Sequence, residues 1–287
     1  MQNIKQILPQ EDKLLQRIAA IDKPAKMLWY VGKLQPVLPT VAVVGSRKPT
    51  AYGRAISARL VSVLVEAGVI IVSGLALGHD ALAHQAALAA GGRTIAVIGN
   101  GLANPHPRTN IRLAEDIVKS GGLIISEYAP DTPVRGYQFL QRNRLISALA
   151  DVVVVVEAGE RSGTLNTAMH ALEQGKELMA VPGNVTSPLS VGCNRLIAQG
   201  ATPVLSSHDV LDKLGITLHD SNKVGTKIRY NSPVGQQVYD LILSGVTDGD
   251  QLCQRLNLTP QALAAELTML ELNAYIQPLG NNHWTVC

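Results

Sequence analysis

The sequence predicts an α/β fold with a mostly parallel, doubly wound, Rossmann-like sheet, followed by a small C-terminal winged-helix domain. Three observations support this. Short β-branched runs alternate with helix-length segments up to Asp209, which is the pattern of βαβ units. Apolar residues make up 46% of the chain and aromatic residues only 3%, as in sheets that helices cover on both faces. Beyond Asp209 the apolar runs stop, so a second domain is expected there.

Six apolar runs are expected to be the strands of the sheet, and right-handed crossovers between successive runs make them parallel. They are residues 41–45, 69–73, 94–99, 123–126, 152–157 and 178–181. The intervening helices are expected at residues 52–67, 79–90, 110–120, 139–150 and 163–174. Several of these segments are followed by glycine, which is typical of a helix C-terminus.

The chain is expected to divide into four parts. Residues 1–40 form a lead-in packed on the core, because they contain an amphipathic segment and then an apolar stretch before two prolines. Residues 41–214 form the Rossmann-like domain. Residues 215–231 are polar and carry several charges, which suits a linker. Residues 232–287 form the winged-helix domain.

Three helical patterns and a terminal hairpin indicate the winged helix. They cover residues 234–243, 250–256, 260–272 and 275–286. Asp248 and Thr259 stand at N-cap positions. The third pattern carries Glu266 and Glu271 and no Lys or Arg, whereas a DNA-reading helix needs cations toward phosphates and bases. This acidic domain is therefore expected to bind protein in preference to DNA.

Charge is unevenly distributed along the chain. The net charge is +3, but from Pro233 onward one basic residue stands against five acidic ones, so that this part carries −4 and the rest +7. A polyanion site is therefore expected in the first four-fifths of the chain.

Cysteine usage and hydropathy bear on compartment and cofactors. Cys193, Cys253 and Cys287 have neither CxxC spacing nor a histidine pair at ligand distance, so no disulfide framework, metal or other cofactor is expected. No apolar run reaches the length of a membrane span. The expected location is the cytoplasm.

A phosphate-binding loop is predicted where the first strand ends. An apolar run stops at Gly45-Ser46, and Arg47 follows directly. In open α/β sheets the ligand crevice lies at the carboxyl ends of the strands, where backbone N–H groups and the next helix N-terminus favour an anion. A tight turn with a solvated arginine is the competing interpretation.

Further candidate groups follow the other strands and are expected to face the same rim. They are Ser73, Gly74, Gly101, Arg108, Phe139, Arg142, Asn143, Arg144, Ser162, Gly163 and Thr164. Arg142 and Arg144 point to different sides of a helix, so one is expected to bind DNA while the other pairs with a carboxylate such as Glu127 or Glu157. Phe139 either stacks on a base or belongs to the core.

No catalytic residue is expected. Glu157 follows a buried strand but has no second carboxylate or histidine at fixed spacing, which favours a role in capping the neighbouring loop. His79 and His84 are five residues apart, which does not suit metal binding on one helix face. The candidate serines lack the Gly-x-Ser-x-Gly pattern of a nucleophile elbow.

Six ordered motifs closely resemble the DNA-processing protein A family, also called DprA or Smf, over about residues 25–215. The motifs are Gly45-Ser46-Arg47 with Thr50 and Tyr52-Gly53, then residues 72–84, Ser126-Glu127-Tyr128, residues 139–146, Ser162-Gly163-Thr164, and residues 181–183 with 192–197. The resemblance implies an extended Rossmann-like fold. It further implies a protein without catalytic activity that binds and protects single-stranded DNA without sequence preference, loads the RecA recombinase in natural transformation, and forms a homodimer.

The resemblance also assigns roles to residues. Gly45, Ser46 and Arg47 match the phosphate-binding motif of the family, together with Thr50. Arg108 falls where the family has a basic residue after Tyr-Pro, and residues 142–144 line the same pocket. The chain departs from the family at His79, at His106-Pro107 and at Leu140.

Two other functions remain open at this point. Ser162-Gly163-Thr164 also resembles the loop of nucleotide-monophosphate phosphoribohydrolases, but no acidic residue follows Thr164 before Glu173. A pure interaction scaffold with an unused pocket is the third interpretation, and the arginines at the rim disfavour it.

Overall fold

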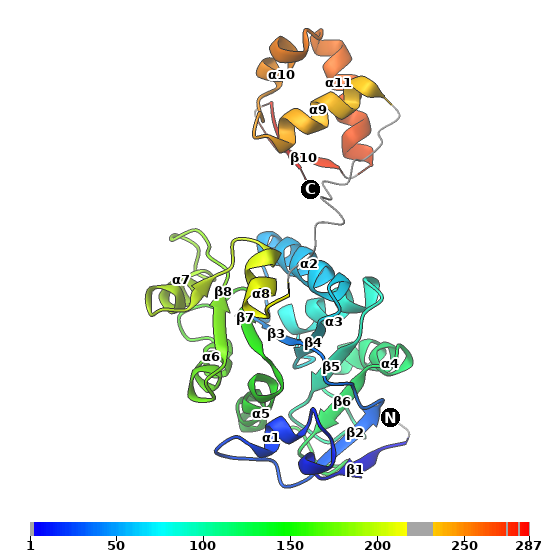
Figure 1. The fold of residues 1–287 in the computed structure, drawn as a ribbon, viewed down its shortest axis with the longest axis vertical. Helices are drawn as coiled ribbons and strands as arrows, with labels where there is room; N and C mark the ends of the chain where they lie inside the picture. The colour runs from blue at the N-terminus through cyan, green and yellow to red at the C-terminus, as the bar shows by residue number, and fades with distance from the viewer. Residues whose placement is uncertain (1–2, 217–231, 274, 281, 287) are drawn as a thin grey trace. The chain divides into compact units, whose positions relative to one another are not determined.

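The computed structural model describes residues 3–216, 232–273, 275–280 and 282–286. The chain divides into two compact units, Met1–Leu218 and His219–Cys287 (Figure 1). Most of the predicted linker, residues 217–231, lies outside the described residues.

The first unit is built on a nine-stranded sheet with the order β1-β2-β6-β5-β4-β3-β7-β8-β9 (Figure 1). Every pair from β6 to β9 is parallel. The strands are β1 Lys5–Ile7, β2 Leu28–Gly32, β3 Thr40–Val44, β4 Ile70–Ser73, β5 Thr94–Val97, β6 Leu123–Ser126, β7 Val152–Val155, β8 Glu177–Ala180 and β9 Thr202–Pro203. The predicted mostly parallel, Rossmann-like sheet is confirmed.

Helices cover both faces of this sheet. They are α1 Gln16–Ala19, α2 Ala51–Glu66, α3 His79–Ala89, α4 Ile111–Lys119, α5 Gly136–Leu149, α6 Thr164–Glu173, α7 Val191–Ala198 and α8 Ser207–Lys213. Alternate residues of β3 point to opposite faces, as a strand period of two requires. Ala42 and Val44 pack with α5, α6 and α7, whereas Val41 and Val43 pack with α2, α3 and α8. Both faces are therefore buried, which explains the unbroken apolar sequence of the strand.

The predicted lead-in does more than pack on the core, because it supplies two strands. β2 pairs antiparallel with β6, and β1 pairs antiparallel with β2. Leu28 and Val31 of β2 are buried, while Trp29 and Tyr30 are half-buried. A short strand such as β2, without regular alternation, has no local signal that separates it from an apolar loop. Its structure depends on pairing with β6, which is 90 residues or more distant in the sequence.

The second unit is a winged helix, as predicted. Its elements are α9 Pro233–Leu243, α10 Gly249–Leu256, α11 Pro260–Leu272, β10 Ile276–Gly280 and β11 His283–Val286. The side chains of Asp248 and Thr259 accept hydrogen bonds from backbone N–H groups of the next helical turn, so both predicted N-caps are confirmed. Val238, Leu252, Leu267 and Leu270 join a core of their own.

Throughout the part of the chain that the structure describes, no helix combines the length and hydropathy needed to cross a lipid bilayer.

Candidate nucleic-acid interface

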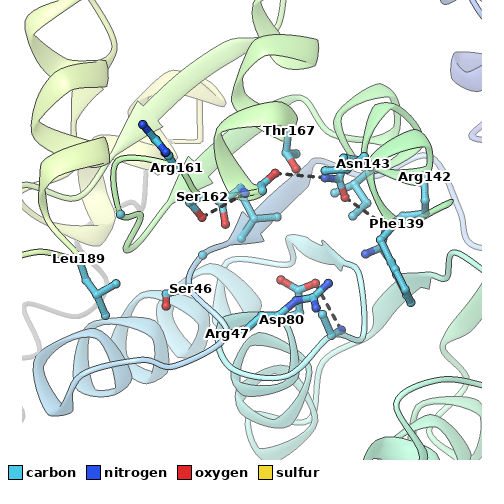
Figure 2. A pocket seen from close by; sticks show the side chains of 18 residues that line it. Ser46, Arg47, Asp80, Phe139, Arg142, Asn143, Arg161, Ser162, Thr167 and Leu189 are labelled. Atoms are coloured by element: carbon cyan, nitrogen blue, oxygen red, sulfur yellow. Dashed lines mark hydrogen bonds between the residues drawn. The ribbon is translucent and has the colours of Figure 1, made fainter. Parts of the chain in front are cut away.

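A pocket of about 490 Å³ lies at the carboxyl edge of the sheet, beside the ends of β3 and β7 (Figure 2). This is the place where chain order reverses, since β3 has β4 on one side and β7 on the other. Ligands of open α/β sheets bind at such a switch point. The loop after β3, helix α5 and the loop leading into α6 supply the walls. The lining residues include Gly45, Ser46, Arg47, Asp80, Phe139, Arg142, Asn143, Arg161, Ser162, Gly163 and Thr164.

Arg47 is exposed at the mouth of the pocket, and no carboxylate of the described residues forms an ion pair with it. Its guanidinium lies 5.5 Å from the ring centroid of Phe139, a distance that permits a cation–π interaction. Phe139 is half-buried and lines the pocket, so the core interpretation of this residue is wrong. The ring of His106 lies 5.9 Å from that of Phe139 on the same rim.

The backbone of the Gly-Ser-Arg loop, residues 45–50, is largely committed to internal hydrogen bonds. The N–H of Ser46 donates to the Glu157 carbonyl at 2.8 Å, and the N–H of Lys48 donates to the Ser46 hydroxyl at 3.1 Å. The N–H of Arg47 has no acceptor among the described residues. The prediction that N–H groups of this turn form an anion cradle therefore applies to Arg47 and not to Ser46.

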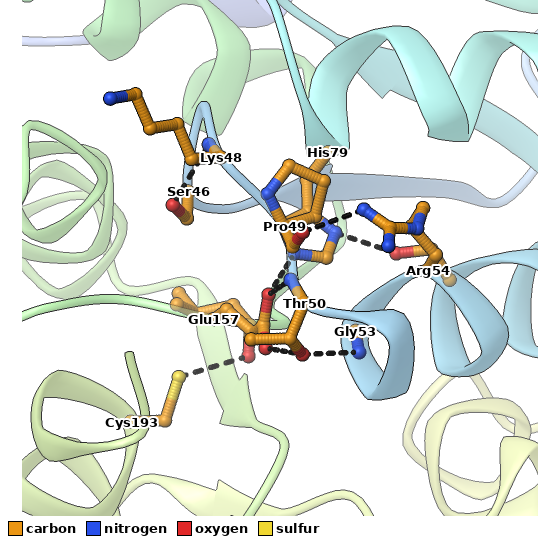
Figure 3. Close-up of polar contacts among 11 residues, drawn as sticks. Ser46, Lys48, Pro49, Thr50, Gly53, Arg54, His79, Glu157 and Cys193 are labelled. Atoms are coloured by element: carbon orange, nitrogen blue, oxygen red, sulfur yellow. Dashed lines mark hydrogen bonds and ion pairs between the residues drawn. The ribbon is translucent and has the colours of Figure 1, made fainter. Parts of the chain in front are cut away.

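The N-terminus of α2 is occupied by a carboxylate of the protein itself (Figure 3). Glu157 Oε2 accepts the N–H of Thr50 at 2.9 Å, and Oε1 accepts the Thr50 hydroxyl at 2.5 Å. Thr50 Oγ1 in turn accepts the N–H of Gly53 at 3.1 Å and caps the helix. The phosphate role predicted for Thr50 is therefore wrong: this residue holds Glu157, which fills the seat that a ligand anion would take.

Glu157 is also bonded to His79. The two groups lie 3.0 Å apart, and both are buried. Burial lowers the pKa of His79, so its imidazole is neutral at physiological pH. Burial alone raises the pKa of Glu157, but the hydrogen bonds from Thr50 and His79 together outweigh it, and the net shift is downward.

The N-terminus of α6 is the helix start that faces the pocket. Ser162 Oγ accepts the N–H of Thr164 at 3.2 Å. The N–H groups of Ser162 and Gly163 have no acceptor in the described structure. Figure 2 shows Ser162 and Asn143 across the pocket from Ser46. The predicted anion seat at residues 162–164 thus has free donors and faces Arg47.

Arg161 was absent from the predicted site. It is exposed and lines the same pocket, although in Figure 2 its guanidinium points away from the pocket centre, so it belongs to the rim. Its position directly before Ser162 was the available signal, because a cation next to a helix N-terminus adds to an anion site.

Arg142 is buried and ties strand ends together. Its Nη1 donates to the Gly74 carbonyl at 2.6 Å and also to the Val97 carbonyl, which follow β4 and end β5. Burial lowers the pKa of Arg142 to about 10, although Asp80 beside it acts in the opposite direction. Burial also disfavours the charged form of Asp80, which raises the pKa of that carboxyl. The donors of Arg142 are thus largely used inside the protein, which contradicts its predicted role on phosphates.

Gly74 and Ser73, which were predicted to face the rim, belong instead to the same interior arrangement as Arg142. A Cβ on Gly74 would lie 2.5 Å from both Arg142 Nη2 and Asp80 Oδ2, so only glycine leaves room for this pair. The Ser73 hydroxyl is buried and donates to the Val43 carbonyl at 2.7 Å, which joins β4 to β3. Neither residue lines the pocket.

The remaining candidates lie away from the pocket or engage other groups. Arg144 forms an ion pair with Glu127 at 2.6 Å, which confirms that one of the two helix arginines pairs with a carboxylate. Asn143 lines the pocket and donates to the Gly163 carbonyl at 3.3 Å. Gly101 is buried against the backbone of Ala129 and Pro130. Arg108 is exposed in the turn before α4 and does not line the pocket.

Sequence comparison finds several relatives. The family described as DNA recombination-mediator protein A matches residues 5–215, and the DprA winged helix domain matches residues 229–282. Protein Smf of Escherichia coli is 39% identical over 269 residues, which cover 91% of this chain and 71% of that protein. The DNA processing protein DprA of Bacillus subtilis is 42% identical over 174 residues, covering 61% of this chain and 58% of the relative.

Solved structures agree with the sequence relatives. The DprA structure from Streptococcus pneumoniae superposes with a TM-score of 0.68 at 40% identity, over 74% of each chain. DNA processing protein A of Helicobacter pylori, described as binding single-stranded DNA in a unique mode, gives a TM-score of 0.64 at 30% identity, over 74% of this chain and 95% of that one. With its doubly wound sheet, its pocket at the switch point and these matches, the chain belongs to the DNA recombination-mediator protein A family.

Proposed function

We propose that this protein binds single-stranded DNA without sequence preference in the pocket between the Gly-Ser-Arg loop and the N-terminus of α6. The backbone phosphates lie against Arg47 and the free N–H groups of Ser162 and Gly163, and Phe139 offers a ring for stacking. The protein protects the strand and transfers it to a recombinase of the RecA type in DNA processing and natural transformation.

The observation that carries the proposal is the sign and exposure of the pocket's ionisable groups. Arg47 and Arg161 are exposed and without an ion-pair partner at the pocket in the described structure. Asp80 is the one carboxyl among the lining residues, and it is buried against Arg142. The accessible charge is therefore positive, which suits a phosphodiester backbone.

We propose further that the protein is not an enzyme. A phosphoribohydrolase needs a carboxylate that reaches the ribose. Asp80 is buried, and the carboxylate of Glu157 is held by Thr50 and His79, so neither is directed at a bound nucleotide. Turnover of a nucleoside monophosphate by the purified protein would contradict this part of the proposal.

The proposed partners follow from the same distribution of charge. Single-stranded DNA engages the basic Rossmann-like unit, and the acidic winged helix engages protein, since α11 has Glu266 and Glu271 and no Lys or Arg. RecA recombinase and a second copy of this chain complete the proposed assembly, which acts in the cytoplasm. The Helicobacter pylori relative supports the DNA ligand, since it is described as binding single-stranded DNA.

The test is fluorescence anisotropy with labelled single- and double-stranded oligonucleotides. Wild type is expected to prefer the single strand, and Arg47→Ala is expected to weaken that binding at least about ten-fold, or about 1.4 kcal/mol. Arg59→Ala is the matched control, because Arg59 is an exposed arginine of α2 outside the pocket. Equal binding by wild type and Arg47→Ala would contradict the assigned site.

A further inference from the structure

A buried polar cluster supports the Gly-Ser-Arg loop from behind. It consists of Thr50, Ser57, His79 and Glu157, and Figure 3 labels all of these except Ser57. The exposed fraction is 0% for Ser57 and His79 and 3% for Glu157, so none of these three can touch bound DNA, whereas Thr50 is half-buried. Such a fully bonded group beneath an exposed loop raises the question of what it does for that loop.

The hydrogen bonds of the cluster form a continuous chain with defined donors. Glu157 Oε2 accepts from Thr50 N at 2.9 Å and pairs with His79 Nε2 at 3.0 Å. A carboxylate only accepts, so Nε2 of His79 carries the proton. Nδ1 of the neutral ring then accepts from the Ser57 hydroxyl, which lies 2.8 Å away. Every polar atom of the His79 ring therefore has a complementary partner.

Backbone bonds connect this cluster to the loop at both of its ends. The Glu157 carbonyl accepts the N–H of Ser46 at 2.8 Å, and the Ser46 carbonyl accepts the N–H of His79 at 3.2 Å. The His79 ring also packs under Gly45, where an added Cβ would lie 2.5 Å from Cδ2. Glu157 and His79 thus hold Gly45 and Ser46 at one end of the loop and Thr50 at the other, while Arg47 lies between these anchors.

We propose that Glu157 and His79 are positioning residues for single-stranded DNA binding: they fix the backbone of residues 45–50 so that the guanidinium and N–H of Arg47 face the pocket. This inference rests on the proposed function. It assigns to a buried carboxylate a favourable effect on binding a polyanion, which is opposite in sign to its Coulombic effect. Preorganisation explains the sign, because an ordered loop loses less conformational entropy when the ligand binds.

The variant Glu157→Gln tests directly whether Glu157 favours or opposes the binding of DNA. The amide keeps the size of the side chain but cannot accept hydrogen bonds at both oxygen positions. The substitution also removes a negative charge near the pocket, and this change by itself would strengthen DNA binding. A positioning role predicts the reverse, a loss of affinity for a single-stranded oligonucleotide of about ten-fold. The salt dependence should stay that of wild type, because Glu157 neutralises no phosphate.

Two variants of His79 provide a matched pair. In His79→Gln the amide nitrogen reaches the place of Nε2 and can still donate to Glu157, so affinity is expected to stay within about two-fold of wild type. In His79→Asn the shorter side chain reaches only the place of Nδ1 and leaves Glu157 without this donor, so affinity should fall as in Glu157→Gln. Wild-type affinity in His79→Asn would overturn the proposal.

Hydrogen–deuterium exchange of the DNA-free protein separates the inference from the proposed function. Amides in residues 45–54 should exchange faster in Glu157→Gln and His79→Asn than in wild type, with unchanged exchange in the distant strand β8. If wild type binds no single-stranded DNA, the proposed function fails, and exchange alone decides whether the cluster orders the loop. Unchanged exchange in both variants, or tighter DNA binding by folded Glu157→Gln, overturns the positioning role.

Discussion

At the scale of single residues, three of the four arginines of the predicted site have three different roles. Arg47 is exposed over Phe139, Arg142 is buried against strand-end carbonyls, and Arg144 forms an ion pair with Glu127. Helical spacing separated Arg142 from Arg144 and predicted that one of them pairs with a carboxylate such as Glu127 or Glu157, of which the structure shows Glu127. It could not tell which of the two was buried, because that depends on Asp80 and on the ends of β4 and β5, which lie far away in the sequence.

Arg142→Met is expected to destabilise the protein by about 3–5 kcal/mol, since it leaves the buried carboxyl of Asp80 without its neighbouring cation and two backbone carbonyls without their donor. Adding Asp80→Asn to Arg142→Met should cost less than the two single changes together, because the partners are coupled. Urea unfolding of the four proteins measures both quantities. A stable Arg142→Met protein with abolished DNA binding would instead make Arg142 a phosphate ligand.

At the scale of elements, β3, β7 and the helices that follow them create the site. The turn after β3 carries Arg47. The loop after β7 places Glu157 at the N-terminus of α2 and Ser162 at the N-terminus of α6. Strand and helix positions were predictable, because apolar runs and glycine ends are local signals. The sequence could not predict which group lies at each helix N-terminus. Glu157 reaches Thr50, at the start of α2, only because β7 pairs with β3.

Helix α3 packs on the sheet through His84, whose Nδ1 lies 2.7 Å from Thr94 Oγ1. The Thr94 hydroxyl donates to the Ile71 carbonyl at 2.7 Å, so His84 Nδ1 must carry the proton, and buried Nε2 has no partner in the described structure. Burial lowers the pKa of His84 to about 3. The unfolded chain, with a histidine pKa of about 6.5, therefore binds the proton first as the pH falls.

The free energy of unfolding is expected to decrease below about pH 6.5 and to keep decreasing toward pH 3, by up to about 1.4 kcal/mol per pH unit for this histidine. His84→Leu removes the contribution, so its pH dependence should be shallower by about that amount per unit. Urea unfolding at pH 7, 6 and 5 compares the slopes. Identical slopes in the two proteins would show that His84 is not the group responsible.

At the scale of the whole molecule, opposite charges are divided between the two units. The winged-helix part from Pro233 onward carries −4 and the rest of the chain +7, and the exposed arginines of the pocket lie on the Rossmann-like unit. Both folds were predictable from periodicity. The two antiparallel strands β1 and β2 were not predicted, because β2 acquires its structure by pairing with the distant strand β6, and β1 by pairing with β2.

The most direct test of the central claim is the salt dependence of single-stranded DNA binding by wild type and Arg47→Ala. If cationic side chains bind the backbone phosphates, the logarithm of the association constant falls linearly with the logarithm of the salt concentration, with a slope of about −0.7 for each phosphate neutralised. The slope for Arg47→Ala is then expected to be shallower by about 0.7. An affinity that does not respond to salt, or an unchanged slope in Arg47→Ala, would contradict the account.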